Sequence, residues 1–194
     1  KVHARQVFDS RGNPTIEAEV TLENNIKASS IVPSGASTGA FEAHELRDND
    51  KNYFLGKSVL KAVENINTII SQKIKNQDPN NQKNIDDILL NLDGTDNKKN
   101  LGANSLLAVS LAVRKASIIL NNETYSNSEN NFSLPYPLMN IINGGAHANN
   151  GLRIQEFMIR PDKAQNFKEA VNICFLVIQK LKTLMIKKNL PTTV

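Results

Sequence analysis

The sequence predicts an α+β domain followed by the first strands and the first helix of an α/β layer or barrel that is incomplete in this chain. Three observations support the prediction. Near the N-terminus, apolar and polar side chains alternate with a period of two, and the segments that follow have apolar residues at helical spacing. After a polar stretch, two short apolar runs precede a long amphipathic helix. Strands followed by helices indicate an α+β domain. Strands that are apolar on both faces indicate a layer that is covered on both sides.

Composition and charge exclude several classes of protein. The chain has 194 residues with 23 Lys and Arg against 19 Asp and Glu, so its formal net charge is +4. This charge is too small and too scattered to indicate a nucleic-acid partner. The single cysteine, Cys174, excludes a disulfide framework, and its position on an apolar stripe favours a core role. The apolar stretches 106–113 and 173–178 are shorter than the roughly 20 residues of a membrane-spanning helix, and no signal peptide is visible.

The N-terminal segment predicts a three-stranded meander. Residues 15–22 alternate strictly between apolar and polar side chains, which is typical of a half-buried antiparallel strand. Turn-forming residues at 9–14 and at Asn24-Asn25 separate this strand from expected strands at 2–8 and 26–32.

Three helices are expected next. Ser58 is the predicted N-cap of the first helix, whose apolar stripe consists of Val59, Val63, Ile66, Ile70 and Ile74. A shorter amphipathic helix ends at Asp93-Gly94. Residues 100–120 are apolar or small on nearly every side and predict a helix buried in the middle of the domain.

A polar stretch at 121–133 has almost nothing to bury and predicts a domain boundary. We expect an N-terminal domain over 1–121, a linker over 122–134 and the second domain over 135–194. The second domain is expected to contain strands at 138–142 and 152–159 and a helix at 167–188. Many of the 27 asparagines lie in such polar stretches. We interpret them as solvated positions rather than prion-like low complexity, because the segments between them keep regular apolar periodicity.

Two loops are candidates for chemistry. The loop 34–39 has no side chain larger than Thr, so its backbone can approach a ligand closely, although it lacks the Gly-Lys-Ser/Thr ending of a P-loop. An ordinary connection is the alternative interpretation. The second loop contains Gly144-Gly145 and His147, which place an imidazole at the end of a strand. A solvated or structural histidine is the alternative there.

Polar residues on the neighbouring strand accompany this histidine. Gln155 and Glu156 lie between apolar residues, and a carboxylate in an apolar strand needs a partner. A salt bridge to Arg153, to Arg160 or to a neighbouring strand is the alternative to a functional role. Arg11 lies in the turn before the second strand. It could bind a ligand, or it could hold the turn together through Asp9. The composition of the turn favours the second role.

Seven blocks of sequence, in the same order and across essentially the whole chain, resemble the enolase family. They are DSRGNPT at 9–15, VPSGASTG at 32–39, ELRD at 45–48, LDGT at 92–95, LGAN at 101–104, NIINGGAHA at 140–148 and QEFM at 155–158. The likeness is of bacterial type. It implies an N-terminal capping domain followed by the start of a modified eight-fold α/β barrel. It also implies a cytoplasmic protein, with a secondary surface or secreted location compatible with the family.

The resemblance implies a Mg²⁺-dependent lyase that interconverts 2-phosphoglycerate and phosphoenolpyruvate in glycolysis. Ser37 matches the mobile-loop serine that binds the second magnesium ion, and Ala36 beside it is expected near the substrate. His147 matches the histidine of the loop that closes over the phosphate end of the substrate. Gln155 and Glu156 match the strand pair that contacts the substrate and assists the acid where the hydroxyl leaves. Arg11 is expected to have a structural or interface role.

The resemblance also implies what this chain lacks and how it departs from the family. The general acid, the three acidic ligands of the first magnesium ion and the lysine base are expected beyond Val194, so the isolated chain is expected to be inactive. Ala108 stands where the family usually has Gly, and Arg153 lies where an acid is common. The family implies a homo-oligomer, a dimer or higher, with no direct nucleic-acid contact and no membrane span.

The alternative from another class is a non-catalytic enolase-like module or relic that acts through protein–protein contacts.

Overall fold

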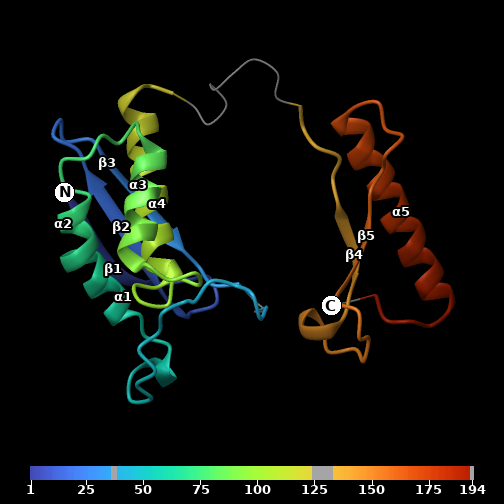
Figure 1. The fold of residues 1–194 in the computed structure, drawn as a ribbon. Coiled ribbons are helices and arrows are strands. Elements are labelled where there is room, and N and C mark those ends of the chain that lie inside the picture. Colours follow the sequence, from blue (N-terminus) through green and yellow to red (C-terminus); the bar gives the residue numbers. More distant parts are fainter. Residues whose placement is uncertain (36–38, 124–132, 193–194) are drawn as a thin grey trace. The chain divides into compact units, whose positions relative to one another are not determined.

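The computed structural model describes residues 1–35, 39–123 and 133–192, and the chain divides into two compact units, Lys1–Ser128 and Glu129–Val194 (Figure 1). The first unit contains a sheet followed by helices. The second contains a strand hairpin and one long helix.

The sheet of the first unit is a three-stranded antiparallel meander in the order β1-β2-β3. Its strands are β1 (Val2–Phe8), β2 (Pro14–Thr21) and β3 (Lys27–Val32), within one residue of the predicted ends. The predicted apolar face of β2 is buried at Ile16, Ala18 and Val20. Strict alternation was therefore a sufficient signal for this part of the fold.

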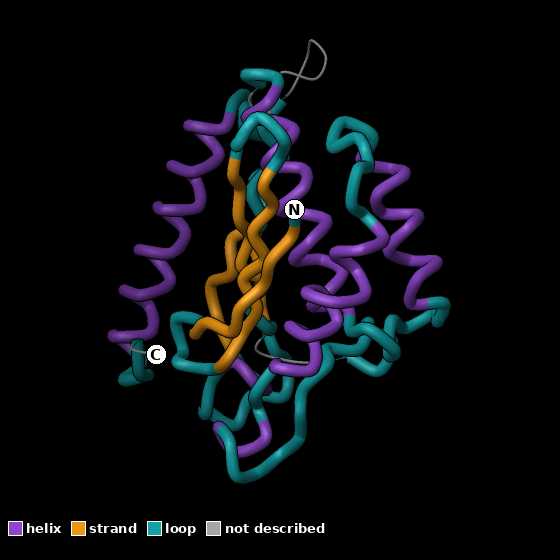
Figure 2. Tube along the Cα trace, turned by 90° about the vertical axis from the view of Figure 1, so that its left-hand side faces the viewer, coloured by secondary structure: helices purple, strands orange, loops and turns teal. Residues whose placement is uncertain are grey.

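Helix α4 (Ala103–Leu120) packs against β2 and β3 and forms the centre of the core (Figure 2). Its length and composition alone would suffice to cross a membrane, but more than half of it is buried inside the unit. The burial identifies α4 as a core helix, as its apolar sequence predicts. Ala108 is completely buried in it, so the core accommodates the methyl group that distinguishes this residue from Gly.

The first long helical segment runs through α1 (Leu60–Asn65), a π-helical turn η2 (Ile66–Ile70) and α2 (Ser71–Lys73). Its predicted stripe is correct, since Ile66, Ile70 and Ile74 are buried. The predicted N-cap is wrong. The capping group is the carboxylate of Asp48, which accepts hydrogen bonds of 2.9 Å from the backbone N–H groups of Leu60 and Lys61. A short 3₁₀ turn, η1 (Phe54–Gly56), precedes this helix.

The end of α3 (Gln82–Asp93) is held by its own last residue, Asp93. The buried carboxylate of Asp93 accepts hydrogen bonds from Leu101 N at 2.7 Å, Thr95 N at 3.0 Å and the Thr95 hydroxyl. Burial by itself raises the pKa of Asp93, but the hydrogen bonds from Thr95 and Leu101 outweigh it and lower the pKa below its usual value. Gly94 follows in the left-handed conformation, with φ of 68°, as the predicted helix stop requires.

The second unit consists of β4 (Met139–Asn143), the 3₁₀ turn η3 (Gly145–His147), β5 (Glu156–Ile159) and α5 (Phe167–Lys187). Strands β4 and β5 pair antiparallel, and residues 152–155 are not part of the strand that was predicted to begin at 152. Cys174 is completely buried, in agreement with its predicted core role. Phe157 and Met158 are exposed, so the predicted covering of both strand faces is absent among the described residues of this unit.

Removing the Asp93 carboxylate should destabilise the first unit. In Asp93→Ala the buried Leu101 N–H loses its partner, and we expect a loss of about 2 kcal/mol in the free energy of unfolding, measured by urea denaturation. Asp96→Ala, which changes an exposed neighbour, is the control and should cost less than about 0.5 kcal/mol.

The same carboxylate should contribute a pH dependence. Because folding lowers the pKa of Asp93, its stabilisation is complete above the pKa of the unfolded chain and is lost as the pH falls toward the folded value. The difference in stability between the wild type and Asp93→Ala should therefore shrink below about pH 4. A difference that stays constant down to strongly acid pH would contradict this role.

Candidate functional site

Two glycines at the end of β4 allow the hairpin to close and bring His147 back over β5. Gly144 N donates to Gln155 O and Gly145 N donates to Leu152 O, each at 2.8 Å. A Cβ on Gly144 would overlap the carbonyl oxygen of Ile154, so close backbone approach requires glycine there. Gly145 has a φ of 54°, which is in the left-handed region. The pair is thus needed for two different reasons, space and backbone conformation.

His147, Gln155 and Glu156 form one side-chain cluster. The His147 Nε2 lies 2.7 Å from the Gln155 Nε2, and the His147 Nδ1 lies 3.2 Å from the Glu156 Oε1. With the amide nitrogen of Gln155 as the donor, Nε2 accepts and Nδ1 carries the proton that it donates to Glu156. The side chains of His147 and Glu156 are 27% and 33% exposed, so both remain open to a ligand.

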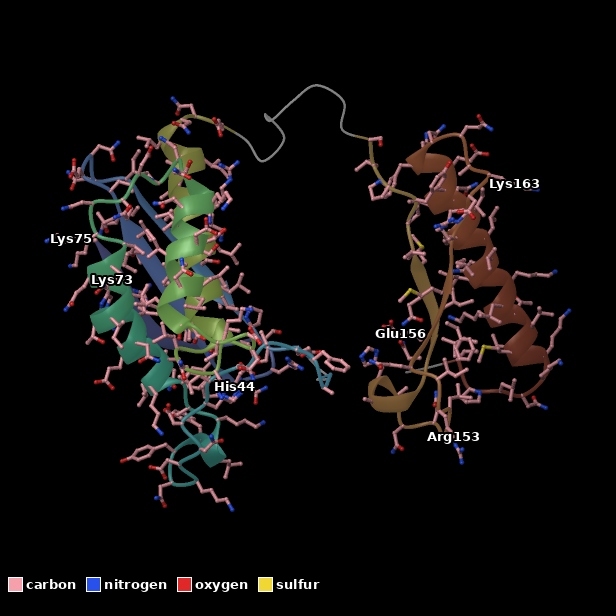
Figure 3. The ribbon with its side chains drawn as sticks, viewed as in Figure 1. His44, Lys73, Lys75, Arg153, Glu156 and Lys163 are labelled. Carbon is pink, nitrogen blue, oxygen red and sulfur yellow. The ribbon has the colours of Figure 1, made fainter. Side chains whose placement is uncertain are left out.

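The arginines that could have neutralised Glu156 do not contact it. Arg160 forms a two-point pair with Asp162, at 2.5 and 3.2 Å. Arg153 is exposed, and its side chain points away from Glu156 (Figure 3). The partner of the Glu156 carboxylate is therefore His147, not Arg153 or Arg160.

In the first unit, a group of charged side chains holds the segment that leads into residues 36–38. We call Arg11, Ser34, Glu45 and Arg47 the loop anchor. Arg47 Nη2 donates to Ser34 Oγ and to Glu45 Oε1, each at 2.7 Å, and the Ser34 hydroxyl also donates to Glu45. Arg11 Nη2 donates to the backbone oxygens of Ser34 at 2.5 Å and Gly35 at 3.4 Å.

Arg11 thus connects the turn after β1 to the loop after β3. Its ion pair with Asp9 is long, at 3.9 Å, and Asp9 instead holds the turn by accepting from the backbone N–H groups of Arg11 and Asn13 at 2.9 Å. The hydrogen bond from Asn13 N contributes most to the lowering of the Asp9 pKa. Ala36 and Ser37 lie outside the described residues.

Sequence reasoning assigned no role to Ser34, Glu45 or Arg47. The available signal was the ELRD block itself, in which two charges of opposite sign flank one apolar residue in a segment between the third strand and the first helix. Arg47 also donates to the backbone oxygens of Pro14, at 3.1 Å, and Lys57. Three partners distant in sequence, Pro14, Ser34 and Lys57, meet at this one guanidinium, which explains why a local pattern does not reveal it.

The described residues do not provide a metal centre by themselves. Among them, no three or more His, Cys, Asp or Glu side chains lie together in a way that could hold a metal ion. Mg²⁺ prefers an octahedron of oxygen ligands. The described donor set does not fit that requirement.

Comparisons with known proteins give one consistent result. The family model for the enolase N-terminal domain matches residues 1–125, and the model for the enolase C-terminal TIM barrel domain matches residues 131–194. The chain is 61% identical to an enolase of Pelagibacter ubique over 100% of its length, and 53% identical to an enolase of Methanococcus maripaludis over 97%. It covers 47% and 45% of these relatives, so it spans about half the length of either. The predicted fold class, a capping domain followed by part of a barrel, is confirmed by the two matches.

Loss of the Arg47 guanidinium should cost more than loss of an ordinary surface arginine. Arg47→Ala leaves Glu45 and two backbone oxygens without their charged donor, and we expect a loss of about 3 kcal/mol in the free energy of unfolding of the first unit. Urea denaturation followed by amide signals of that unit measures it.

Arg5→Ala is the matched control, because the Arg5 side chain is 53% exposed and forms one ion pair, to Glu17 at 2.7 Å. It should cost no more than about 1 kcal/mol. Equal costs for the two variants would show that the loop anchor is no stronger than a surface ion pair.

Proposed function

Because this chain belongs to the enolase family, we propose that the protein that carries it is a lyase that interconverts 2-phosphoglycerate and phosphoenolpyruvate in glycolysis. The observation that supports the proposal most directly is the placement of His147 between Gln155 and Glu156. One imidazole nitrogen is held by a carboxylate, and the other contacts an amide that a ligand could replace. Such an imidazole can take up a proton and bind an anion.

The chemistry of this cluster follows from its two hydrogen bonds. In the neutral ring, Nε2 accepts from Gln155 while the Nδ1 proton is donated to Glu156. If a phosphoester oxygen approaches, a proton on Nε2 would let the ring donate to it, and Glu156 would stabilise the resulting imidazolium. The Gln155 amide would then be released from the ring and could bind another group of the substrate. We propose His147 and Glu156 as catalytic residues on this basis, and Gln155 as substrate-binding.

We further propose that the reaction depends on Mg²⁺, that Ser37 is one of its ligands and that Ala36 lies near the substrate, from the family resemblance of their loop. The enolase superfamily uses a Lys or His base with one or two Mg²⁺ ions to hold the negative charge that develops on the substrate. The described residues hold no cluster of metal ligands. On the same family premise, we propose that the 194-residue chain by itself has no turnover.

Domain division, assembly and location are proposed on the same family premise. We propose a capping domain over 1–121, a linker over 122–134 and the barrel portion from 135 onward. We also propose a cytoplasmic homo-oligomer, a dimer or higher, without a nucleic-acid partner.

The phosphoester should bind at His147. The chain has three histidines, His3, His44 and His147, so their imidazole nitrogen signals can be followed individually by NMR. Addition of 2-phosphoglycerate should shift the His147 ring signals toward the protonated form and leave those of His3 and His44 in place. Glu156→Gln should weaken this binding about tenfold, because the variant no longer offers a carboxylate to the Nδ1 proton.

Asp162→Asn is the control for a lost carboxylate in the same unit, since Asp162 pairs with Arg160 and does not touch the cluster. It should leave binding unchanged. In the complete enzyme, His147→Asn should lower kcat about a hundredfold or more in a Mg²⁺-dependent assay. Absence of both phosphoester binding and turnover would favour the non-catalytic module.

A further inference from the structure

Two Asn-Gly dipeptides lie in the same hairpin, at 143–144 and at 150–151. In such a dipeptide the backbone nitrogen of glycine can attack the side-chain amide carbon of the preceding asparagine, because glycine has no Cβ to shield the approach. Whether the attack occurs depends on how freely the backbone can reach the required geometry, since a misplaced nucleophile loses rate steeply. The two dipeptides differ in this respect.

Asn150 and Gly151 lie in an exposed turn. Gly151 has a φ of 76°, and nothing lies within 4 Å of the position a Cβ would take, so the turn has open space around it. Leu152 N donates to Asn150 Oδ1 at 3.1 Å, which forms an Asx turn. A donor at this oxygen polarises the amide and stabilises the negative charge that would develop on the oxygen during attack. Asn143 Oδ1 also has a donor, the Asn140 side-chain amide, so the two dipeptides differ at the glycine nitrogen and its backbone rather than at the amide oxygen.

Asn143 and Gly144 are held in the hairpin instead. Asn143 is the last residue of β4 and pairs with Glu156, and the nitrogen of Gly144 is engaged with Gln155 O at 2.8 Å. Gly144 is also buried and packed against Ile154. The nucleophilic nitrogen and the backbone on both sides of it are therefore fixed.

We propose that Asn150 is a site of spontaneous deamidation and that the hairpin protects Asn143. The Gly151 nitrogen forms a bond to Asn150 Cγ, the Cγ–Nδ2 bond breaks, and ammonia leaves with the proton that the glycine nitrogen loses. Water then opens the succinimide ring at either carbonyl and leaves aspartate or isoaspartate. The sum is one water consumed and one ammonia released, with no oxidation or reduction.

The modification would change the loop that carries His147. Asn150 Nδ2 donates to Asn143 O at 2.8 Å and so ties the turn to the end of β4. A carboxylate cannot make this bond, and isoaspartate also adds one backbone atom to the loop. We therefore expect a looser Gly144–Gly151 loop after deamidation. An effect on phosphoester binding rests in addition on the proposed function, whereas the reaction at Asn150 does not.

Ageing of the purified protein in mildly alkaline buffer tests the reaction. Peptide mapping by mass spectrometry measures the exchange of amide for acid, and isoaspartyl methyltransferase labelling identifies the isoaspartate. In the folded protein, deamidation at Asn150 should be at least about tenfold faster than at Asn143, and in urea the two rates should approach each other. Equal rates in the folded protein, or no isoaspartate at Asn150, would overturn the proposal.

A pair of variants tests the consequence. Asn150→Asp removes the hydrogen bond to Asn143 O, while Asn149→Asp places the same charge one residue earlier on an exposed side chain. Amide hydrogen exchange in the Gly144–Gly151 loop should speed up in the first variant and stay unchanged in the second. Equal acceleration in both would assign the effect to charge alone and contradict the role of the Asn150 bond. Neither result bears on whether His147 binds a phosphoester, so the two proposals can fail separately.

Discussion

Side chains hold the backbone of the segment 45–48, and the rest of the first unit depends on this segment. It belongs to no helix or strand, yet it connects the loop after β3 to the start of α1. The Asn104 amide pairs with both the N–H and the carbonyl of Leu46, at 3.0 Å each, as a neighbouring strand would. Asp48 caps α1, and Arg47 completes the loop anchor. Backbone groups outside helices and strands still need hydrogen-bond partners, and here carboxylates, an amide and a guanidinium supply them.

The glycine of the LGAN block belongs to the same arrangement. Gly102 has a φ of 91°, and a Cβ there would lie 2.5 Å from Leu46 Cβ and from Asn104 Oδ1. Its lack of a side chain lets α4 begin directly beside residue 46. The LGAN block is thus explained by packing. Gly102 allows the start of α4 to lie close to Leu46, and Asn104 forms the hydrogen bonds to the Leu46 backbone.

Periodicity predicted the elements of the first unit because each strand and helix buries one face of its own sequence. It could not predict how their ends are bonded. Ser58 has the residue type of an N-cap, but a carboxylate ten residues earlier takes that place. The π-helical turn was also invisible, and it contains Asn67, whose amide bonds to both backbone groups of Ala4 in β1. These partners are distant in sequence, so no local pattern encodes them.

Residue types at the candidate site were predictable, whereas their pairing was not. A glycine pair before a histidine, and a carboxylate in an apolar run, indicate polar chemistry without showing which groups meet. The antiparallel register decides this, because it places Glu156 opposite Asn143 and so within reach of the turn that follows. The end of β5 also explains why the alternative, an arginine pair with Glu156, is absent: Arg160 lies beyond the end of β5 and pairs with Asp162.

The asparagines show how composition acquires meaning only with backbone conformation. Outside glycine, eight described residues have positive φ, and five of them are asparagines, at positions 25, 49, 76, 122 and 189. Asparagine tolerates the left-handed conformation better than other residues with a Cβ. Some of the asparagine positions that we interpreted from the sequence as solvated are therefore also positions that require a left-handed backbone conformation, which glycine adopts elsewhere in the chain. Other asparagines, outside this group, have a side-chain amide carbon that the following glycine can attack. The contrast between residues 143 and 150 assigns the protection of that carbon to strand pairing rather than to the dipeptide sequence.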